Sequence, residues 1–181
     1  ERDPHESTQA ILDAKMAVSE ALRDIRLSVS ALRSPESEFQ LEEDLKKLVR
    51  SVDSPGLKVT LDLSGDEGLY SRSTRVALYR AAQEGLTNIQ KHAQATHAFL
   101  RIVFDENAAR MVLRDDGIGF EPERLSEIGT SSNNNFGLRG LRERLEMLRG
   151  NMQIKSSPNQ DTVLMVEIPR VIESLESKGV R

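Results

Sequence analysis

The sequence predicts an α/β sandwich, in which a mixed β-sheet carries helices on one face and is preceded by one long amphipathic helix. Two observations lead to this fold class. Period-two apolar patterns, as over 57–63 and 97–104, recur between longer helical patterns. The region before Pro35 carries a heptad repeat instead. Helices packed on one side of a sheet bury both apolar surfaces in a single core.

A bundle-forming helix is predicted from Ile11 to Leu32, and it should end near Arg33. Ile11, Val18, Ile25 and Leu32 follow a heptad spacing, which is typical of helices that pair. Pro35 disfavours helical geometry in the preceding residue and marks a domain boundary. We therefore divide the chain into an arm over 1–34, a globular domain over 35–170, and a tail over 171–181 that is frayed or forms a short helix.

The globular domain should begin with a helix from Ser37 or Glu38 to Val52. A strand over 57–63 follows, and its alternation gives it one exposed face. A longer helix is predicted over 71–92. It leads into two strands, over 97–104 and 110–114, that are joined as a hairpin.

The second half of the domain completes the sheet. Residues 121–135 have no periodicity and are rich in serine and asparagine, so we interpret them as a mobile lid. A helix over 136–148 is ended by Gly150. Strands over 152–155 and 162–168 follow, separated by a Ser-Pro-Asn turn.

Composition excludes several classes of partner and compartment. The chain has 181 residues and a net charge of −4, so it offers no general basic field and we expect no nucleic-acid partner. It has no cysteine, which fits a reducing compartment and favours a cytoplasmic location. No apolar run is long enough to cross a membrane, so we expect no direct membrane contact by this fragment. Because the first residue is Glu1, membrane anchoring of a longer parent protein stays open.

Three polar residues of the 71–92 helix lie along one side of it. Glu84 and Asn88 are four positions apart, and Lys91 is three further on. An amide oxygen is a suitable hard ligand for Mg²⁺, so Asn88 is the candidate metal ligand. Glu84 is the candidate catalytic residue, which would hold a metal-bound water or orient a nucleophile, and Lys91 would neutralise phosphate charge. On its own, the same triad is also typical of a solvated helix face.

A second block, D-D-G-I-G-F over 115–120, follows the second hairpin strand. A carboxylate only accepts hydrogen bonds, so Asp115 can select the exocyclic amine of adenine. Gly117 and Gly119 would let a flat base approach the backbone. A plain Asp-Gly turn, with Asp116 as part of it, explains the same letters.

A third block, F-G-L-R-G over 136–140, opens the next helix. Free backbone N–H groups at a helix N-terminus bind phosphate, so Gly137 and Gly140 are candidate phosphate-binding positions. The alternative is a helix capped by Asn135, with a small-residue packing contact at Gly140.

The three blocks, in this order, resemble the catalytic and ATP-binding domain of two-component sensor histidine kinases, in the subfamily paired with NarL-type response regulators. The resemblance covers nearly the whole chain and implies a Bergerat (GHKL) fold. The family's motifs assign ligand-binding roles to residues of the N box, G1 box and G2 box and to one strand residue. These are Glu84, Asn88, Lys91 and His92; Asp115, Gly117 and Gly119; Gly137, Leu138 and Gly140; and Thr162. The chain departs from the family at Asn134-Asn135 and Asp161, where glycines are usual.

The resemblance implies a protein-histidine kinase that binds Mg-ATP and transfers the γ-phosphoryl group to a histidine for relay to a response regulator. Residues 21–33 resemble the second helix of the family's dimerisation and histidine-phosphotransfer domain, which implies a homodimer through the arm. The family's acceptor helix, in which a histidine followed directly by Asp or Glu lies near an Arg-rich run, is not found in this sequence. His5 lies at the wrong end of the arm, so we expect the acceptor upstream of this sequence.

Three other functions stay open. A GHKL ATPase that works as a conformational machine would use Glu84 to activate water. An anti-sigma-type serine kinase shares the pocket but does not account for the amphipathic arm. A non-catalytic module would hold nucleotide and dimerise without chemistry. The sequence identifies neither the sensed signal nor the response regulator.

Overall fold

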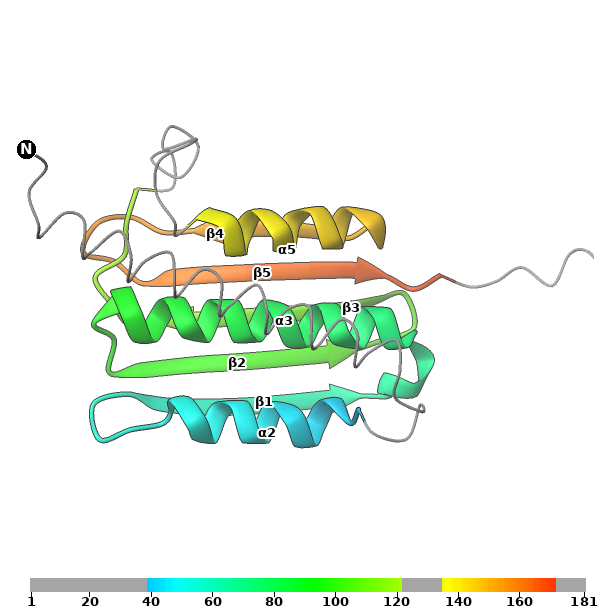
Figure 1. The fold of residues 1–181 in the computed structure, drawn as a ribbon, viewed down its shortest axis with the longest axis horizontal. Helices are drawn as coiled ribbons and strands as arrows, with labels where there is room; N and C mark the ends of the chain where they lie inside the picture. Colours follow the sequence, from blue (N-terminus) through cyan, green and yellow to red (C-terminus); the bar gives the residue numbers. More distant parts are fainter. Residues whose placement is uncertain (1–38, 122–134, 172–181) are drawn as a thin grey trace, which may run out of the picture.

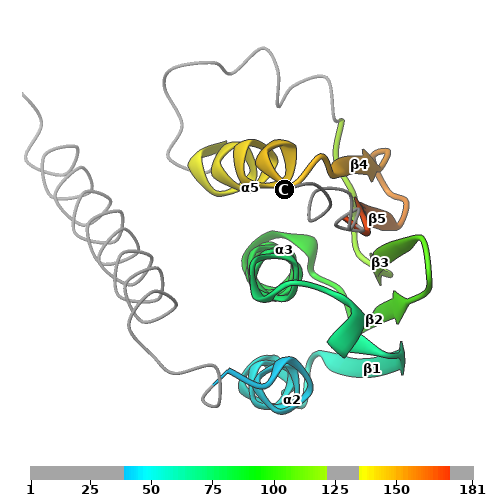
Figure 2. The same ribbon diagram turned by 90° about the vertical axis from the view of Figure 1, so that its right-hand side faces the viewer.

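A computed structural model of the chain describes residues 39–121 and 135–171. The predictions for the arm helix, Pro35, His5, the body of the lid over 122–134 and the tail beyond 171 lie outside these residues. Within them, three helices cover one face of a five-stranded sheet (Figures 1 and 2). This arrangement confirms the predicted α/β sandwich. No helix among the described residues is both long enough and apolar enough to cross a membrane.

The sheet is mixed and has the strand order β1-β2-β3-β5-β4. β1 (Lys58–Gly65) pairs in parallel with β2 (His97–Phe104). The other neighbours, among them β3 (Ala108–Asp115), β5 (Thr162–Pro169) and β4 (Asn151–Lys155), pair antiparallel. Parallel strands need a long connection between them, and the helical segment between β1 and β2 supplies it.

Every strand except β2 is longer than the patterns predicted. β1 begins one residue later than Leu57 and extends to Gly65. β3 includes Asp115, which was predicted to follow the strand and is in fact its last residue. The pairing register sets Asp115 against Ala98 on one side and Thr162 on the other. The backbone of Asp115 is therefore fixed by two neighbouring strands.

Helix α2 (Leu41–Val52) begins later than predicted. Gln40 has an extended backbone, with φ −116° and ψ 107°. Phe39 precedes it without helical structure and packs edge-on against an α3 tyrosine, with ring centroids 5.9 Å apart. The predicted start at Ser37 or Glu38 is therefore wrong. The helix begins where three acidic residues in its first turn complement the positive end of the helix dipole.

Helix α3 (Arg72–Asn88) lies between α2 and α5 and against the middle of the sheet (Figure 2). The Ser71 hydroxyl oxygen caps its start by accepting the Thr74 N–H at 3.2 Å. Gly85 sits on its inner face, where a Cβ would meet Leu113 of β3. A small residue at this position lets the helix backbone approach the sheet closely.

The predicted helix over 71–92 is not α-helical to its end. Ile89–Ala93 form one π-helical turn, which closes at Gln94 in the left-handed conformation with φ 53°. A π turn holds more residues than an α turn, so Lys91 and His92 do not continue the α-helical stripe that begins at Glu84. Periodicity could not predict this change, because it assumes one angular step per residue throughout.

Helix α5 (Asn135–Met147) packs against α3 and β4. The helix buries its own Leu141 and Leu145 side chains in the core. The chain leaves the helix through Arg149 at φ 55°, and the Gly150 N–H donates to the Leu145 carbonyl at 2.8 Å. These contacts agree with the predicted stop at Gly150.

The core lies between the helix layer and the sheet. β2 alternates buried and exposed side chains along its length, as a strand with one covered face should. The largest fully buried side chains are aliphatic and come from all three helices and three of the strands. They are Leu41, Leu45, Leu78, Leu86, Leu100, Ile102, Met111, Leu145 and Ile168. The candidate site lies at the end of the sheet where β3 ends and β5 begins.

Candidate functional site

The three sequence blocks converge at the end of the sheet where β3 stops and β5 starts. Asp115 and Thr162 are register partners there. The π turn Ile89–Ala93 brings the C-terminal end of α3 to the same place, because the Ala93 carbonyl accepts the Ile118 N–H at 2.8 Å. The first turn of α5 meets α3 here, because Gly137 lies directly against the Glu84 side chain. Residues distant in sequence therefore surround one region.

Asp115 is a buried acceptor. Its residue is 4% exposed, and its Oδ1 accepts the Gly117 N–H at 2.9 Å. Burial raises the pKa of the Asp115 carboxyl, the Gly117 bond opposes that rise, and the charges of Asp116 and Asp161 add to it. A carboxylate has about four acceptor positions, so the single bond recorded among the described residues leaves capacity for a donor such as an exocyclic amine.

Gly117 and Gly119 are required by the protein itself. A Cβ at Gly117 would lie 2.8 Å from the Ala93 Cβ and 2.7 Å from Asp115 Oδ1. Gly119 has φ 57°, and a Cβ there would collide with the carbonyl oxygens of Ser157 and Gln160. The sequence interpretation gave these glycines a role toward the base. The structure adds a different reason, which is close approach between backbone segments.

Gly119→Ala is therefore expected to destabilise the domain by about 2–4 kcal/mol, because the added methyl meets two backbone oxygens and the left-handed backbone is unfavourable for alanine. Urea unfolding measures this change. Gly140→Ala is the matched control within the same family motifs. No described atom lies within 4 Å of a Cβ there, so it should stabilise α5 by up to about 1 kcal/mol. Equal stability of Gly119→Ala and the parent chain would contradict the prediction.

Thr162 is held beside Asp115 by the turn between β4 and β5. Its hydroxyl lies 2.9 Å from the Ser156 hydroxyl, which accepts the Phe120 N–H at 3.0 Å. The Asn159 N–H donates to the Ile118 carbonyl at 2.6 Å. Ser156 was not singled out from the sequence, because a serine next to a Ser-Pro-Asn turn carries no signal beyond the turn itself.

Glu84, Asn88 and Gly137 form a second group where α3 meets α5. The Asn88 amide nitrogen donates to Glu84 Oε1 at 3.2 Å. A Cβ at Gly137 would overlap the Glu84 carboxylate in its present position, so a larger residue there would require the Glu84 side chain to move. The structure thus brings the first and third sequence blocks into contact.

The same group fits a magnesium site in which the protein supplies few ligands and phosphate oxygens and waters supply the rest. The bond to Glu84 commits the amide nitrogen of Asn88, so its amide oxygen is the atom available to ligate a cation. The described residues contain no cluster of three or more His, Cys, Asp or Glu that could hold a metal ion by themselves. Mg²⁺ suits such a site, because it binds through few protein ligands together with phosphate oxygens and waters.

The remaining predicted residues lie around this region with fewer defining contacts. Lys91 and His92 are exposed on the π turn, and Leu138 is half-buried in the first part of α5. Gly140 is exposed. The alternative explanation for Gly140 was a packing contact. Among the described residues no atom lies within 4 Å of a Cβ built at Gly140, so they make no such contact.

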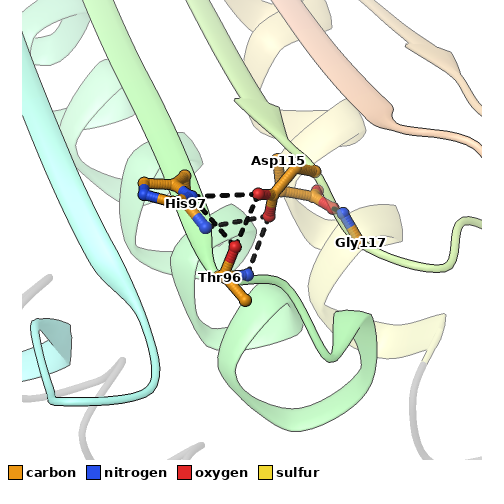
Figure 3. A network of polar contacts seen from close by, with 5 residues as sticks. Thr96, His97, Asp115 and Gly117 are labelled. Carbon is orange, nitrogen blue, oxygen red and sulfur yellow. Dashed lines mark hydrogen bonds and ion pairs between the residues drawn. The ribbon is translucent and has the colours of Figure 1, made fainter.

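A polar network joins the turn after β3 to the start of β2 (Figure 3). The Asp116 carboxylate accepts the backbone N–H groups of Thr96 and His97, both at 2.8 Å, and the Thr96 hydroxyl at 2.7 Å. His97 Nδ1 lies 3.1 Å from Asp116 Oδ2. Asp116 was predicted to be part of a turn, but its partners are 19 and 20 positions away, so no local pattern could reveal them.

A family model described as histidine kinase-, DNA gyrase B-, and HSP90-like ATPase matches residues 73–172, which is more than half of the chain. One curated relative is the signal transduction histidine-protein kinase/phosphatase DegS of Brevibacillus brevis, 30% identical over 93% of this chain and 42% of its own length. Another is the signal transduction histidine-protein kinase/phosphatase UhpB of Salmonella typhimurium, 33% identical over 91% of this chain and 31% of its own length. The chain thus spans less than half the length of either relative.

Solved structures support the fold. The Acinetobacter baumannii histidine kinase AdeS matches with a TM-score of 0.61 and 14% identity, covering 94% of this chain and 87% of that chain. The histidine kinase domain of the Erythrobacter litoralis EL346 blue-light activated histidine kinase matches with a TM-score of 0.56 and 17% identity, over 72% of this chain and 59% of that chain. Because the matched family model runs from the start of α3 to the end of β5 and includes every candidate residue, this chain belongs to the histidine kinase-, DNA gyrase B- and HSP90-like ATPases.

Proposed function

We propose that this chain is the catalytic and ATP-binding part of a two-component sensor histidine kinase. It would bind Mg-ATP and transfer the γ-phosphoryl group to a histidine on a dimerisation helix outside this sequence. The observation that carries the proposal is the buried Asp115 carboxylate with spare acceptor capacity. It occurs in a chain of an ATPase family, and two relatives named as histidine-protein kinase/phosphatases match more than nine-tenths of its length.

Base recognition would rest on Asp115. Its buried carboxylate can accept the exocyclic amine of adenine and would repel a carbonyl oxygen at the same position. The Thr162 hydroxyl and the backbone near Gly117 and Gly119 would border the base. Since the Gly117 N–H already holds Oδ1 at 2.9 Å, the carboxylate is oriented before the nucleotide arrives.

Phosphate and metal would be held where α3 meets α5. Bound Mg²⁺ would offset the charge of the phosphates. The Asn88 amide oxygen would ligate it, and Lys91, with the backbone around Gly137, Leu138 and Gly140, would lie toward the phosphates. His92 shares the π turn with Lys91 and would border the same region. Glu84 accepts the Asn88 amide at 3.2 Å and would thereby orient that ligand.

Glu84 is also the proposed catalytic residue. Its carboxylate could accept a proton from the attacking histidine or orient a metal-bound water. The remaining contribution of the protein would be alignment of the donor phosphate with the acceptor and neutralisation of charge, which dominate phosphoryl transfer.

Asn88→Asp is expected to abolish Mg-ATP binding or turnover while the fold stays intact. The change replaces the amide nitrogen that donates to Glu84 by a carboxylate oxygen about 3 Å from a second carboxylate, and like charges at this distance repel. Calorimetric titration with Mg-ATP and the rate of phosphoryl transfer measure the effect, and circular dichroism checks the fold. Unchanged Mg-ATP binding together with unchanged transfer would contradict the metal assignment.

The wider context of the protein is part of the same proposal. We infer a homodimer formed through the arm over 1–34, a response regulator of the NarL type as the recipient of the phosphoryl group, and a cytoplasmic location for this domain. The sequence relatives support the regulator and the dimer, since several are named as sensor histidine kinases.

The test uses a longer version of the protein that includes the upstream helix, incubated with ATP labelled in the γ position. We expect label on the protein that is lost in acid and stable in base, which is the behaviour of phosphohistidine. Acid-stable label would favour a serine kinase. Steady hydrolysis of ATP without labelled protein would favour a conformational ATPase. Nucleotide binding with neither reaction would leave a binding module.

A further inference from the structure

The network around Asp116 has no part in the proposed chemistry, yet Asp116 is the chain neighbour of Asp115, the residue that would recognise the base. Asp116 immediately follows Asp115, and its carboxylate accepts hydrogen bonds from Thr96 and from His97, the first residue of β2. Oδ1 accepts the Thr96 and His97 N–H groups at 2.8 Å, and Oδ2 accepts the Thr96 hydroxyl at 2.7 Å. A backbone bond from the Asp116 N–H to the His97 carbonyl, at 3.2 Å, closes the connection.

This arrangement ties the turn to a well-anchored part of the sheet. The Thr96 carbonyl accepts the Lys58 N–H at 2.8 Å, so the segment that holds Asp116 is itself bonded to the start of β1. On its other side the same turn is bonded to Ala93 through the Ile118 N–H. The turn is therefore fixed at both of its ends, at one by the Asp116 side chain and at the other by the π turn.

We propose that Asp116, held by Thr96 and His97, is a positioning residue that fixes Asp115 and Gly117 in the conformation that recognises adenine. The proposal rests on the proposed function, since it assigns a role within the same nucleotide site. Asp116 does not itself touch the base. Without its bonds, the turn would sample other conformations, and the Asp115 carboxylate would lose its fixed direction.

The Asp116 carboxylate is held in its charged form. Hydrogen bonds from the His97 N–H and the Thr96 hydroxyl, in that order of effect, bring the pKa of Asp116 far below its usual range. These bonds therefore stabilise the fold at neutral pH. That contribution is complete above the ordinary pKa of an aspartate and is lost as the pH falls through the lowered value.

The test compares ADP and IDP binding to the full 181-residue chain by calorimetry or competition. The two ligands differ at position 6 of the base, where ADP has an amine and IDP a carbonyl, and at the neighbouring N1, which carries a hydrogen only in IDP. Asp116→Ala is expected to weaken ADP binding about tenfold and to lower the ADP-to-IDP affinity ratio. Thr96→Val should weaken ADP binding by about threefold, and Thr96→Ser, which restores the hydroxyl, should recover most of this loss.

The matched control is Asp62→Ala. Asp62 also pairs with a partner on β2, Arg101 at 3.3 Å, and its side chain is 44% exposed, compared with 45% for Asp116. The control should leave both affinities unchanged. Urea unfolding of each variant confirms that the chain is folded under the binding conditions.

Two results would overturn the positioning role while the proposed function stands: Asp116→Ala binding ADP as tightly as Asp62→Ala does, or an unchanged ADP-to-IDP ratio in Asp116→Ala. Failure of the unaltered chain to bind ADP, or undiminished ADP binding by Asp115→Asn, would instead overturn the proposed function. The two failures are therefore distinguishable in one set of titrations.

Discussion

Asp115→Asn is expected to weaken ATP and ADP binding by about 100-fold or more, because a charged acceptor buried against the base is replaced by a neutral amide. One face of that amide presents N–H groups, which would oppose the exocyclic amine of adenine instead of accepting from it. Titration of the folded variant with ADP measures the loss. Undiminished binding would mean that Asp115 is only a turn residue.

The stability of the same variant is the internal control. Burial raises the pKa of Asp115, so its charged form is unfavourable in the folded state at neutral pH. Removing the charge should therefore leave the free energy of unfolding unchanged or increase it. A loss of nucleotide binding without a loss of stability separates a recognition residue from a structural one.

The raised pKa also predicts the pH dependence of binding in the unaltered chain. Because the folded pKa lies above the unfolded one, protonation of Asp115 removes its cost to stability as the pH falls through the raised value. The carboxylate that accepts the base disappears over the same interval. Relative to Asp115→Asn, the affinity of the parent chain for ADP should therefore fall as the solution becomes acidic.

Glu84→Gln is expected to reduce phosphoryl transfer to histidine by about 100-fold or more, the usual effect of removing a general base. Nucleotide binding should change little, since glutamine keeps the size of the side chain beside Gly137 and an oxygen that can accept the Asn88 amide. Single-turnover transfer at saturating Mg-ATP separates the chemical step from binding.

Glu143→Gln is the control for this experiment. Glu143 lies on the exposed side of α5, where it pairs with Arg139 at 3.1 Å. The same change of glutamate to glutamine there should leave the transfer rate unaltered. Transfer by Glu84→Gln at the rate of this control would remove Glu84 from the catalytic role.

Much of the fold follows from local patterns. The alternation of apolar residues in β2 specifies a strand, because the environment of its side chains repeats at the period of the backbone. The end of α5 follows from Gly150, a local stop signal. Where the environment changes within an element, the pattern failed. Helix α3 turns into a π turn at Ile89 because the chain there must meet the turn after β3, a requirement that comes from residues more than 20 positions away.

The candidate site divides in the same way. Residue chemistry alone selects Asp115, Glu84 and Asn88 as acceptor, acid and metal ligand, since these properties belong to single side chains at fixed spacing. Residue chemistry also explains glycine at 117 and 119 by the approach of a flat base to the backbone. The structure gives a different reason, which is close contact between backbone segments. Gly119 is required by the carbonyl oxygens of a turn about 40 positions further along the chain, which only the assembled sheet brings to it.

The sequence by itself therefore determined the class of fold, the order of the three blocks and the chemistry of their side chains. The tertiary structure decided which blocks touch: Glu84 against Gly137, Gly117 against Ala93, and Asp116 against Thr96 and His97. The physical reason is the range of the interactions. Period and propensity act between near neighbours, whereas close packing and hydrogen bonds between strands and turns depend on residues that become neighbours only when the chain has folded.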